Sequence, residues 1–134
     1  MSLIIYTDGS CMPNPGPGGW AFIVLADYND EYPIEWHVSG GYEQSTNNRM
    51  EMMAVIEALN FINKKKCVIY TDSQYVINCA SGNWARKKNL DLWSEYDEAS
   101  KNIEIEWIWV KGHSGNNYNE IVDRLAKQEV KKIS

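Results

Sequence analysis

The sequence lacks the features of exported and membrane-spanning chains. Its N-terminus has no basic stretch followed by a long apolar segment, and no apolar run approaches ~18 residues. Cysteine is scarce, because Cys11, Cys67 and Cys79 are an odd number without CxxC spacing. This usage predicts reduced thiols in a cytoplasmic protein. The lack of a long apolar run predicts that the protein has no membrane partner.

An excess of positive charge is also absent. The chain has 13 Lys+Arg against 18 Asp+Glu, a formal charge of −5, which taken alone argues against a nucleic-acid partner. Basic residues nevertheless cluster at 64–66, 86–88 and 131–132. A solvated surface is the favoured interpretation of the first and last clusters. The run 86–88, beside Trp84, is a better candidate for contact with a phosphate backbone.

What is present fits one folded domain over residues 1–134, with 44% hydrophobic and 12% aromatic residues. Residue patterns predict strands at 3–7, 20–26, 35–42, 67–71 and 103–110, and helices at 48–63, 74–80, 90–100 and 118–132. The Pro- and Gly-rich segment 8–19 predicts a tight loop, and its "GPGG" lacks the GK[ST] of a nucleotide-binding loop. We therefore expect a layered α/β domain without a small-molecule cofactor: an antiparallel meander, then strands that return through helical crossovers.

Two aspartates close short apolar strands in matching segments, "IYTD" at 5–8 and again at 69–72. Taken singly, Asp8 before Gly9 is a turn signal and Asp72 is typical of a helix N-cap. The flanking sequences differ, which argues against an internal repeat. Both aspartates stand at strand ends, where the sites of open α/β sheets form.

Two further carboxylates belong to predicted helices. At roughly 100° per residue, Glu51 projects onto the apolar stripe of its helix. Asn48 and Glu51 could form a capping-box variant, but a carboxylate that faces the core needs a partner, which favours a functional role. Asp123 borders the apolar stripe of the last helix, and alone it is typical of a surface residue or of an ion-pair partner of Lys127.

Considered together, Asp8, Glu51, Asp72 and Asp123 can converge at one edge of a sheet. Such a cluster persists only when it is protonated or bound to cations, and oxygen ligands favour Mg²⁺ or Mn²⁺. Without these four carboxylates the balance is 13 cationic against 14 acidic residues, so most of the net charge would belong to the metal site.

Five segments together resemble type 1 ribonuclease H over nearly the whole chain: "YTDGSCMPNPGPGGW", "STNNRMEMMAVIEAL", "YTDSQYV", "NLDLW" and "WVKGHSGNNYNEIVDRLA". The resemblance implies the ribonuclease H fold, a five-stranded mixed sheet flanked by helices. It also implies a monomeric endonuclease of DNA replication that uses two Mg²⁺ ions, or Mn²⁺ in their place. This enzyme would hydrolyse the RNA strand of RNA/DNA hybrids and leave 5′-phosphate and 3′-hydroxyl ends.

The same resemblance implies roles for the acidic residues. Asp8 would bridge the two metal ions, Glu51 and Asp72 would bind the ion on the leaving-group side, and Asp123 would bind the ion that activates water. His113, in a Gly-flanked loop, matches the family's mobile histidine for proton transfer or product release. A solvated loop histidine is the alternative.

Substrate contacts are implied in the same way. The positions that match the family's groove-reading and phosphate-holding residues are Thr46, Asn47 and Asn48, with Asn14 and Gln74 as further minor-groove candidates. Cys11 would lie near the 2′-hydroxyls of the RNA strand, Asn89 would form a phosphate pocket beside the other strand, and Trp84 would be the remnant of a basic protrusion.

The chain departs from the family pattern in two places. Only residues 77–90 occupy the span of the long basic, Trp-rich protrusion of many bacterial members, which predicts a weaker and more salt-sensitive grip on the hybrid. Gln44 stands where relatives often have a basic residue near the phosphate pocket. Two alternatives remain: another nuclease of the same fold, such as an integrase or resolvase, and a non-catalytic hybrid-binding module.

Overall fold

The computed structural model describes residues 3–27, 33–111 and 117–134. Within these ranges, the elements in chain order are β1 (Leu3–Cys11), β2 (Gly16–Asp27), β3 (Pro33–Ser45), α1 (Asn47–Phe61), β4 (Lys66–Thr71), α2 (Gln74–Ala80), α3 (Leu90–Ser100), β5 (Glu104–Trp109) and α4 (Asn117–Ile133). No helix within these ranges is long and apolar enough to cross a membrane.

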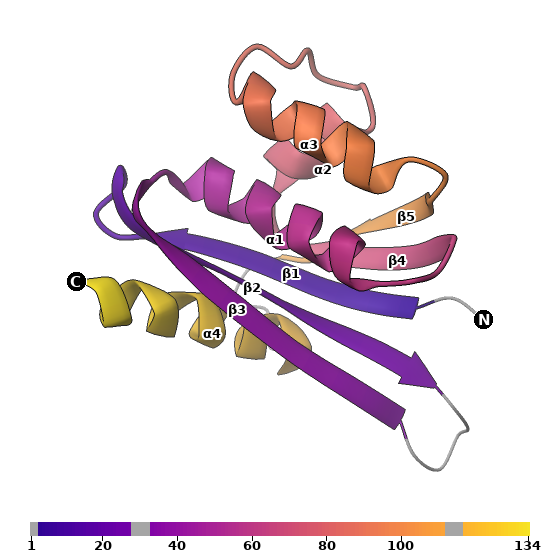
Figure 1. Cartoon of the computed structure of the whole chain (residues 1–134), viewed down its shortest axis with the longest axis horizontal. Helices are drawn as coiled ribbons and strands as arrows, with labels where there is room; N and C mark the ends of the chain where they lie inside the picture. Colours follow the sequence, from indigo (N-terminus) through magenta and orange to yellow (C-terminus); the bar gives the residue numbers. More distant parts are fainter. Residues whose placement is uncertain (1–2, 28–32, 112–116) are drawn as a thin grey trace.

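The five strands form one mixed sheet in the spatial order β3-β2-β1-β4-β5 (Figure 1). β1, β2 and β3 pair antiparallel, whereas β4 pairs parallel with β1 and β5 parallel with β4. Helix α1 covers one face of the sheet, with α2 and α3 on the same side, and α4 covers the other face. The meander and the helical crossovers expected from the sequence are confirmed.

The expectation of a tight loop over 8–19 is wrong for most of that segment. β1 continues to Cys11 and β2 begins at Gly16, so that Ser10 pairs with Gly19. Gly19 instead lets α4 pack closely against the backbone of β2. A Cβ atom on Gly19 would lie 2.1 Å from the carbonyl oxygen of Ala126 in α4. Composition alone does not distinguish this use of glycine from a turn.

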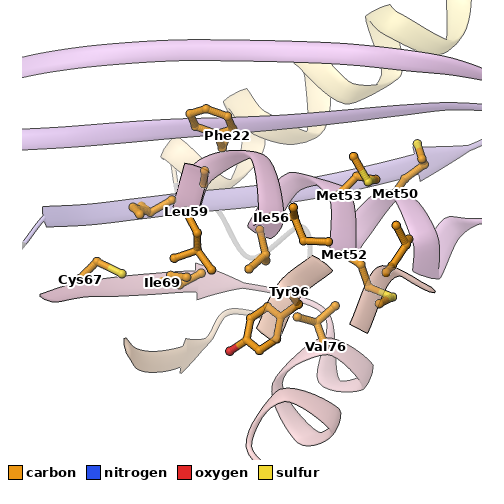
Figure 2. Packing of buried hydrophobic residues seen from close by; sticks show 14 of the residues in the cluster. Phe22, Met50, Met52, Met53, Ile56, Leu59, Cys67, Ile69, Val76 and Tyr96 are labelled. Carbon is orange, nitrogen blue, oxygen red and sulfur yellow. The ribbon is translucent and has the colours of Figure 1, made fainter. Parts of the chain in front are cut away.

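The main core lies between α1 and the sheet and extends to α2 and α3. Helix α1 is rich in strong helix formers, and Thr46 caps it by accepting a hydrogen bond from the Arg49 backbone N–H at 3.2 Å. Figure 2 shows Met52 and Ile56 of α1 in the same cluster as Ile69 of β4 and Tyr96 of α3. This packing holds α1 against β1 and β2.

The matching "IYTD" segments are neighbouring strands in register. In the parallel β1–β4 pair, Ile5 is opposite Ile69 and Tyr6 is opposite Tyr70, and the two tyrosine rings stack with centroids 4.6 Å apart. Because side chains alternate along a strand, Thr7 and Thr71 lie on the other face, under α1, where both are fully buried. The prediction that the two segments are neighbours is confirmed.

The structure describes every residue of the connection from α2 to α3, and this connection contains no helix between Ala80 and Leu90. Arg86 in this connection points inward: its Nε donates to the Cys79 carbonyl oxygen at 3.0 Å, and its guanidinium lies 4.5 Å from the Trp93 ring centroid. Asp97 also accepts hydrogen bonds from the Arg86 guanidinium at 2.8 and 2.9 Å, and the contact of the run 86–88 with phosphate stays a prediction.

The two buried threonines provide a matched test of the packing under α1. The Thr71 hydroxyl accepts the Ser73 backbone N–H at 3.1 Å, whereas the Thr7 hydroxyl has no hydrogen-bond partner among the described residues. We expect Thr71→Val to lower the free energy of unfolding by about 1 kcal/mol, and Thr7→Val to leave it unchanged or raise it by up to about 1 kcal/mol. Urea unfolding measures both, and equal losses would contradict this account of the two hydroxyls.

Candidate active site

Three carboxylates meet at the edge of the sheet where β1 and β4 run into the loops. Asp8 comes from β1, Glu51 from the first turns of α1, and Asp72 from the residue after β4. One oxygen of each lies within 4.8 Å of the others, and Asp8 and Glu51 are only 3% and 4% exposed. Strand alternation and helix periodicity thus bring together three groups that lie far apart in the sequence.

Gly9 allows Glu51 to reach Asp8. A Cβ atom at this position would lie 2.3 Å from the Glu51 backbone nitrogen and 2.4 Å from the Met50 carbonyl carbon, so α1 rests directly on the β1 backbone. The Gly9 N–H donates to Asp8 Oδ1 at 2.9 Å and to Glu51 Oε1 at 3.1 Å. One backbone N–H therefore orients both carboxylates, and only glycine gives α1 the necessary room.

The electrostatics favour protons or cations between these groups. Burial raises the pKa of Asp8 to about 7; the neighbouring charges of Asp72 and Asp123 also raise it, against the hydrogen bonds from Glu51 and Gly9. Burial, and then the Asp8 charge, raise the pKa of Glu51 well above its usual range.

The second oxygen of Glu51, Oε2, is buried and receives no hydrogen bond from an N–H or O–H donor in the described part of the chain. A hard cation would satisfy that oxygen and neutralise the neighbouring carboxylates. Within the described residues the donor set is three carboxylates without a nitrogen or sulfur ligand, which fits Mg²⁺ or Mn²⁺.

Asp123 of α4 lines the same cleft, which has a volume of about 430 Å³ and is also lined by Asp8, Glu51 and Asp72. It is outside the compact group of three, and its side chain is 28% exposed. Lys127 Nζ lies 3.0 Å from Asp123 Oδ2, so the i,i+4 ion pair that the sequence offered as the alternative is formed.

Several candidates for substrate contact surround this cleft. Its lining includes Asn47, Asn48 and Gln74. Asn14 approaches from the β1–β2 connection, and its Oδ1 accepts the Asn47 backbone N–H at 3.1 Å. The polar side chains predicted to read the substrate therefore border the carboxylates.

Other candidates lie further from the carboxylates or point inward. The Cys11 thiol is buried and lies 3.3 Å from each of three carbonyl oxygens, and burial raises its pKa. Trp84 is 48% exposed in the α2–α3 connection. Asn89 precedes α3 and donates from Nδ2 to the Tyr75 hydroxyl at 3.0 Å. His113 lies outside the described residues.

Helix capping by the candidate residues differs from expectation. Thr46, and not Asn48, is the N-cap of α1, so the capping-box interpretation of Asn48 and Glu51 is wrong. Likewise Ser73, and not Asp72, caps α2 by accepting the Val76 backbone N–H at 3.1 Å. Helix capping therefore does not explain the presence of Asn48 or Asp72 at these positions.

Sequence reasoning missed two contributors to the surroundings of the site. Arg49 lines a cavity next to the cleft together with Asp91, and Tyr75 lines the cleft itself. Arg49 stands two residues before Glu51, and this proximity was the available signal. The pairing with Asp91 depends on how α3 packs against α1, and no sequence pattern indicates it.

The sheet order and the acidic edge define a class, an α/β domain with a cation-binding cleft at the ends of its central strands. A model of the RNase H family matches residues 1–131, so the chain belongs to the ribonuclease H family, whose members are metal-dependent nucleases.

Relatives named Ribonuclease H cover nearly the whole chain. The Treponema denticola protein is 44% identical over 99% of this chain and 99% of its own length. The Hahella chejuensis protein is 45% identical over 95% of this chain and 92% of its own.

Solved structures agree with this assignment. LC9-RNase H1, a type 1 RNase H with the type 2 active-site motif, superposes with a TM-score of 0.83 at 30% identity, covering 98% of this chain and 73% of that one. LC11-RNase H1 in complex with RNA/DNA hybrid superposes with a TM-score of 0.82 over 98% of each chain. Its identity is 19%, so it shows the fold alone.

The raised pKa values predict how the stability of the metal-free protein depends on pH. Asp8 ionises near 3.8 when it is freely solvated and near 7 in the fold, so the folded state holds the extra proton between these values. Stability is therefore greatest below about pH 4 for this group and falls as pH rises through 7. Each unit of pKa difference corresponds to about 1.4 kcal/mol.

Urea unfolding in chelator between pH 5 and pH 8 measures this fall. Asp8→Asn should flatten it, saturating Mg²⁺ should reduce it, and Glu57→Gln on the same helix should leave it intact. A pH-independent stability of the metal-free wild type would contradict the prediction.

Substitution of Gly9 tests the close contact of α1 with β1. Gly9→Ala places a methyl group within 2.4 Å of backbone atoms, which cannot move as side chains can. We expect α1 to shift, the free energy of unfolding to fall by roughly 1–3 kcal/mol, and Mg²⁺ affinity to fall with it. The matched control is Gly82→Ala, where a Cβ atom meets nothing within 4 Å, although its φ of 82° adds strain. Gly82→Ala should lose stability without losing metal affinity, and an equal loss of metal affinity would contradict the prediction.

Proposed function

We propose that the chain hydrolyses the RNA strand of RNA/DNA hybrids at the cleft formed by Asp8, Glu51, Asp72 and Asp123. The observation that carries the proposal is the buried Asp8–Glu51 pair, with one Glu51 oxygen lacking a donor. Such a pair needs a proton or a cation, and a cation among carboxylates at an open cleft is suited to phosphodiester chemistry. A relative of the same fold forms a complex with RNA/DNA hybrid.

The residues divide the work by position. Asp8, the most central, would hold two Mg²⁺ ions together, with Glu51 and Asp72 on the leaving-group side and Asp123 on the side of the attacking water. When bound, these ions would supply Lewis-acid stabilisation of the phosphate and lower the pKa of water. The products would be 5′-phosphate and 3′-hydroxyl ends.

Asp123 and His113 would serve the water side of the reaction. The Lys127 ammonium lies 3.0 Å from Asp123 Oδ2, and both residues line the cleft. His113 would accept or deliver a proton, a role that suits an imidazole side chain.

The substrate would be held by polar groups around the cleft. Asn47, Asn48 and Gln74 line it, and Asn14 braces the start of α1. Thr46, Trp84 and Asn89 would extend the contact along the duplex. The Cys11 thiol is buried beside three carbonyl oxygens, so contact near this residue would come from the backbone, which suits recognition of 2′-hydroxyls. We propose a cytoplasmic, monomeric, single-domain enzyme that acts on hybrids formed in DNA replication.

Cleavage assays test this proposal. The protein is incubated with RNA/DNA hybrid, duplex RNA and duplex DNA of one sequence, with Mg²⁺ and with chelator. We expect cleavage of the hybrid alone, dependent on Mg²⁺, and a fall of at least about 100-fold in kcat for Asp8→Asn and Glu51→Gln, because each loses a charged ligand. Glu57→Gln, on the outer side of the same helix, should retain activity.

Two outcomes would overturn the proposal. Binding of hybrid without cleavage would identify a non-catalytic binding module. Cleavage of duplex DNA in preference to hybrid would identify another nuclease of the same fold.

A further inference from the structure

The guanidinium of Arg49 is held by the carboxylate of Asp91. Nη1 and Nη2 donate to the two carboxylate oxygens at 2.9 and 2.7 Å, and this contact joins α1 to the first turn of α3. Nη1 also lies 3.3 Å from Asn89 Oδ1. The guanidinium lowers the pKa of Asp91 to about 2. Arg49 is thus engaged through its planar, bidentate fork.

This pair lines a cavity of about 200 Å³ beside the acidic cleft. Among the described residues that line this cavity, Arg49 is the one cation, against the carboxylates of Asp91 and Glu95, and Gln44 adds no charge. The Arg49 side chain is 32% exposed, so a ligand can reach it. An anion that enters this cavity meets a guanidinium whose charge is already cancelled.

A duplex bound at the cleft would bring its backbone past Arg49. Each strand of a DNA duplex carries one phosphate per ~3.4 Å of helix axis, and Arg49 stands next to Asn48, which lines the cleft. The guanidinium fork binds a phosphate in the same bidentate way as it binds a carboxylate. Exposed ion pairs contribute little net stability, so a phosphate can compete with Asp91 for Arg49.

We propose that Asp91 weakens binding of the hybrid by occupying Arg49, which is a latent phosphate contact of this chain. The inference rests on the proposed function, because it takes the hybrid as the ligand of the neighbouring cleft. Asp91 is therefore a determinant of affinity that acts through Arg49, and its removal should strengthen binding.

A second ion pair on α3 supplies a matched control. Asp97 accepts from Arg86 Nη1 at 2.8 and 2.9 Å, and its side chain is 60% exposed against 63% for Asp91. Arg86, however, is also held by the Cys79 carbonyl oxygen and by the Trp93 ring. Asp97→Asn removes the same charge from the same helix but leaves its arginine in place.

The experiment measures the Kd of a fluorescent RNA/DNA hybrid by anisotropy in chelator, over a range of KCl concentrations. We expect Asp91→Asn to bind roughly threefold to tenfold more tightly than wild type, with a log Kd against log salt slope steeper by about 0.7–0.9, as for one additional phosphate contact. Asp97→Asn should tighten binding less and leave the slope unchanged. The double variant Arg49→Gln/Asp91→Asn should lose the gain.

Each contrary outcome has one meaning. Equal effects of Asp91→Asn and Asp97→Asn, or a gain that survives in the double variant, would overturn the inference and leave the proposed function intact if the wild type cleaves hybrid. A wild type that neither binds nor cleaves hybrid would overturn both. Urea unfolding midpoints close to that of the wild type establish that the variants are folded during the assay.

Discussion

The rest of the site depends on the contact between the backbone of α1 and Gly9. Without a side chain at this position, α1 lies directly on β1, and Glu51 reaches the carboxylate of Asp8 from the opposite side of the strand. The Gly9 N–H then orients both groups. The closeness that makes the pair unfavourable when it is charged and metal-free is also what makes it a ligand for a cation.

The fold holds these unfavourable charges in place through the core around α1. Apolar side chains from α1, β4 and α3 pack on one side of the sheet, and a smaller cluster under α4 closes the other. The Tyr6 ring of β1 stacks on the Tyr70 ring of β4, and these residues stand two positions before Asp8 and Asp72. Because the scaffold fixes the strand ends, the carboxylates cannot separate to relieve their repulsion.

Much of this arrangement could be predicted from the sequence, because local residue patterns indicated which strands are neighbours and which helix face is buried. The repeated "IYTD" segments indicated neighbouring strands, and the helical projection placed Glu51 toward the core; the structure confirms both. The failures have a common cause. Gly19 and Asn48 were interpreted from composition and spacing, but the close approach of α4 and the N-cap at Thr46 decide their roles. Tertiary contacts of this kind leave no local signal.

The central claim is that Asp8, Glu51 and Asp72 form one cation site. The most direct test is a crystal structure of the protein with Mn²⁺, in which anomalous scattering locates the ion. The account predicts an ion bound by oxygens of all three residues at roughly 2.0–2.2 Å, with the Glu51 oxygen that lacks a donor among them. An ion bound by only one of these carboxylates, or by groups outside the cleft, would contradict it.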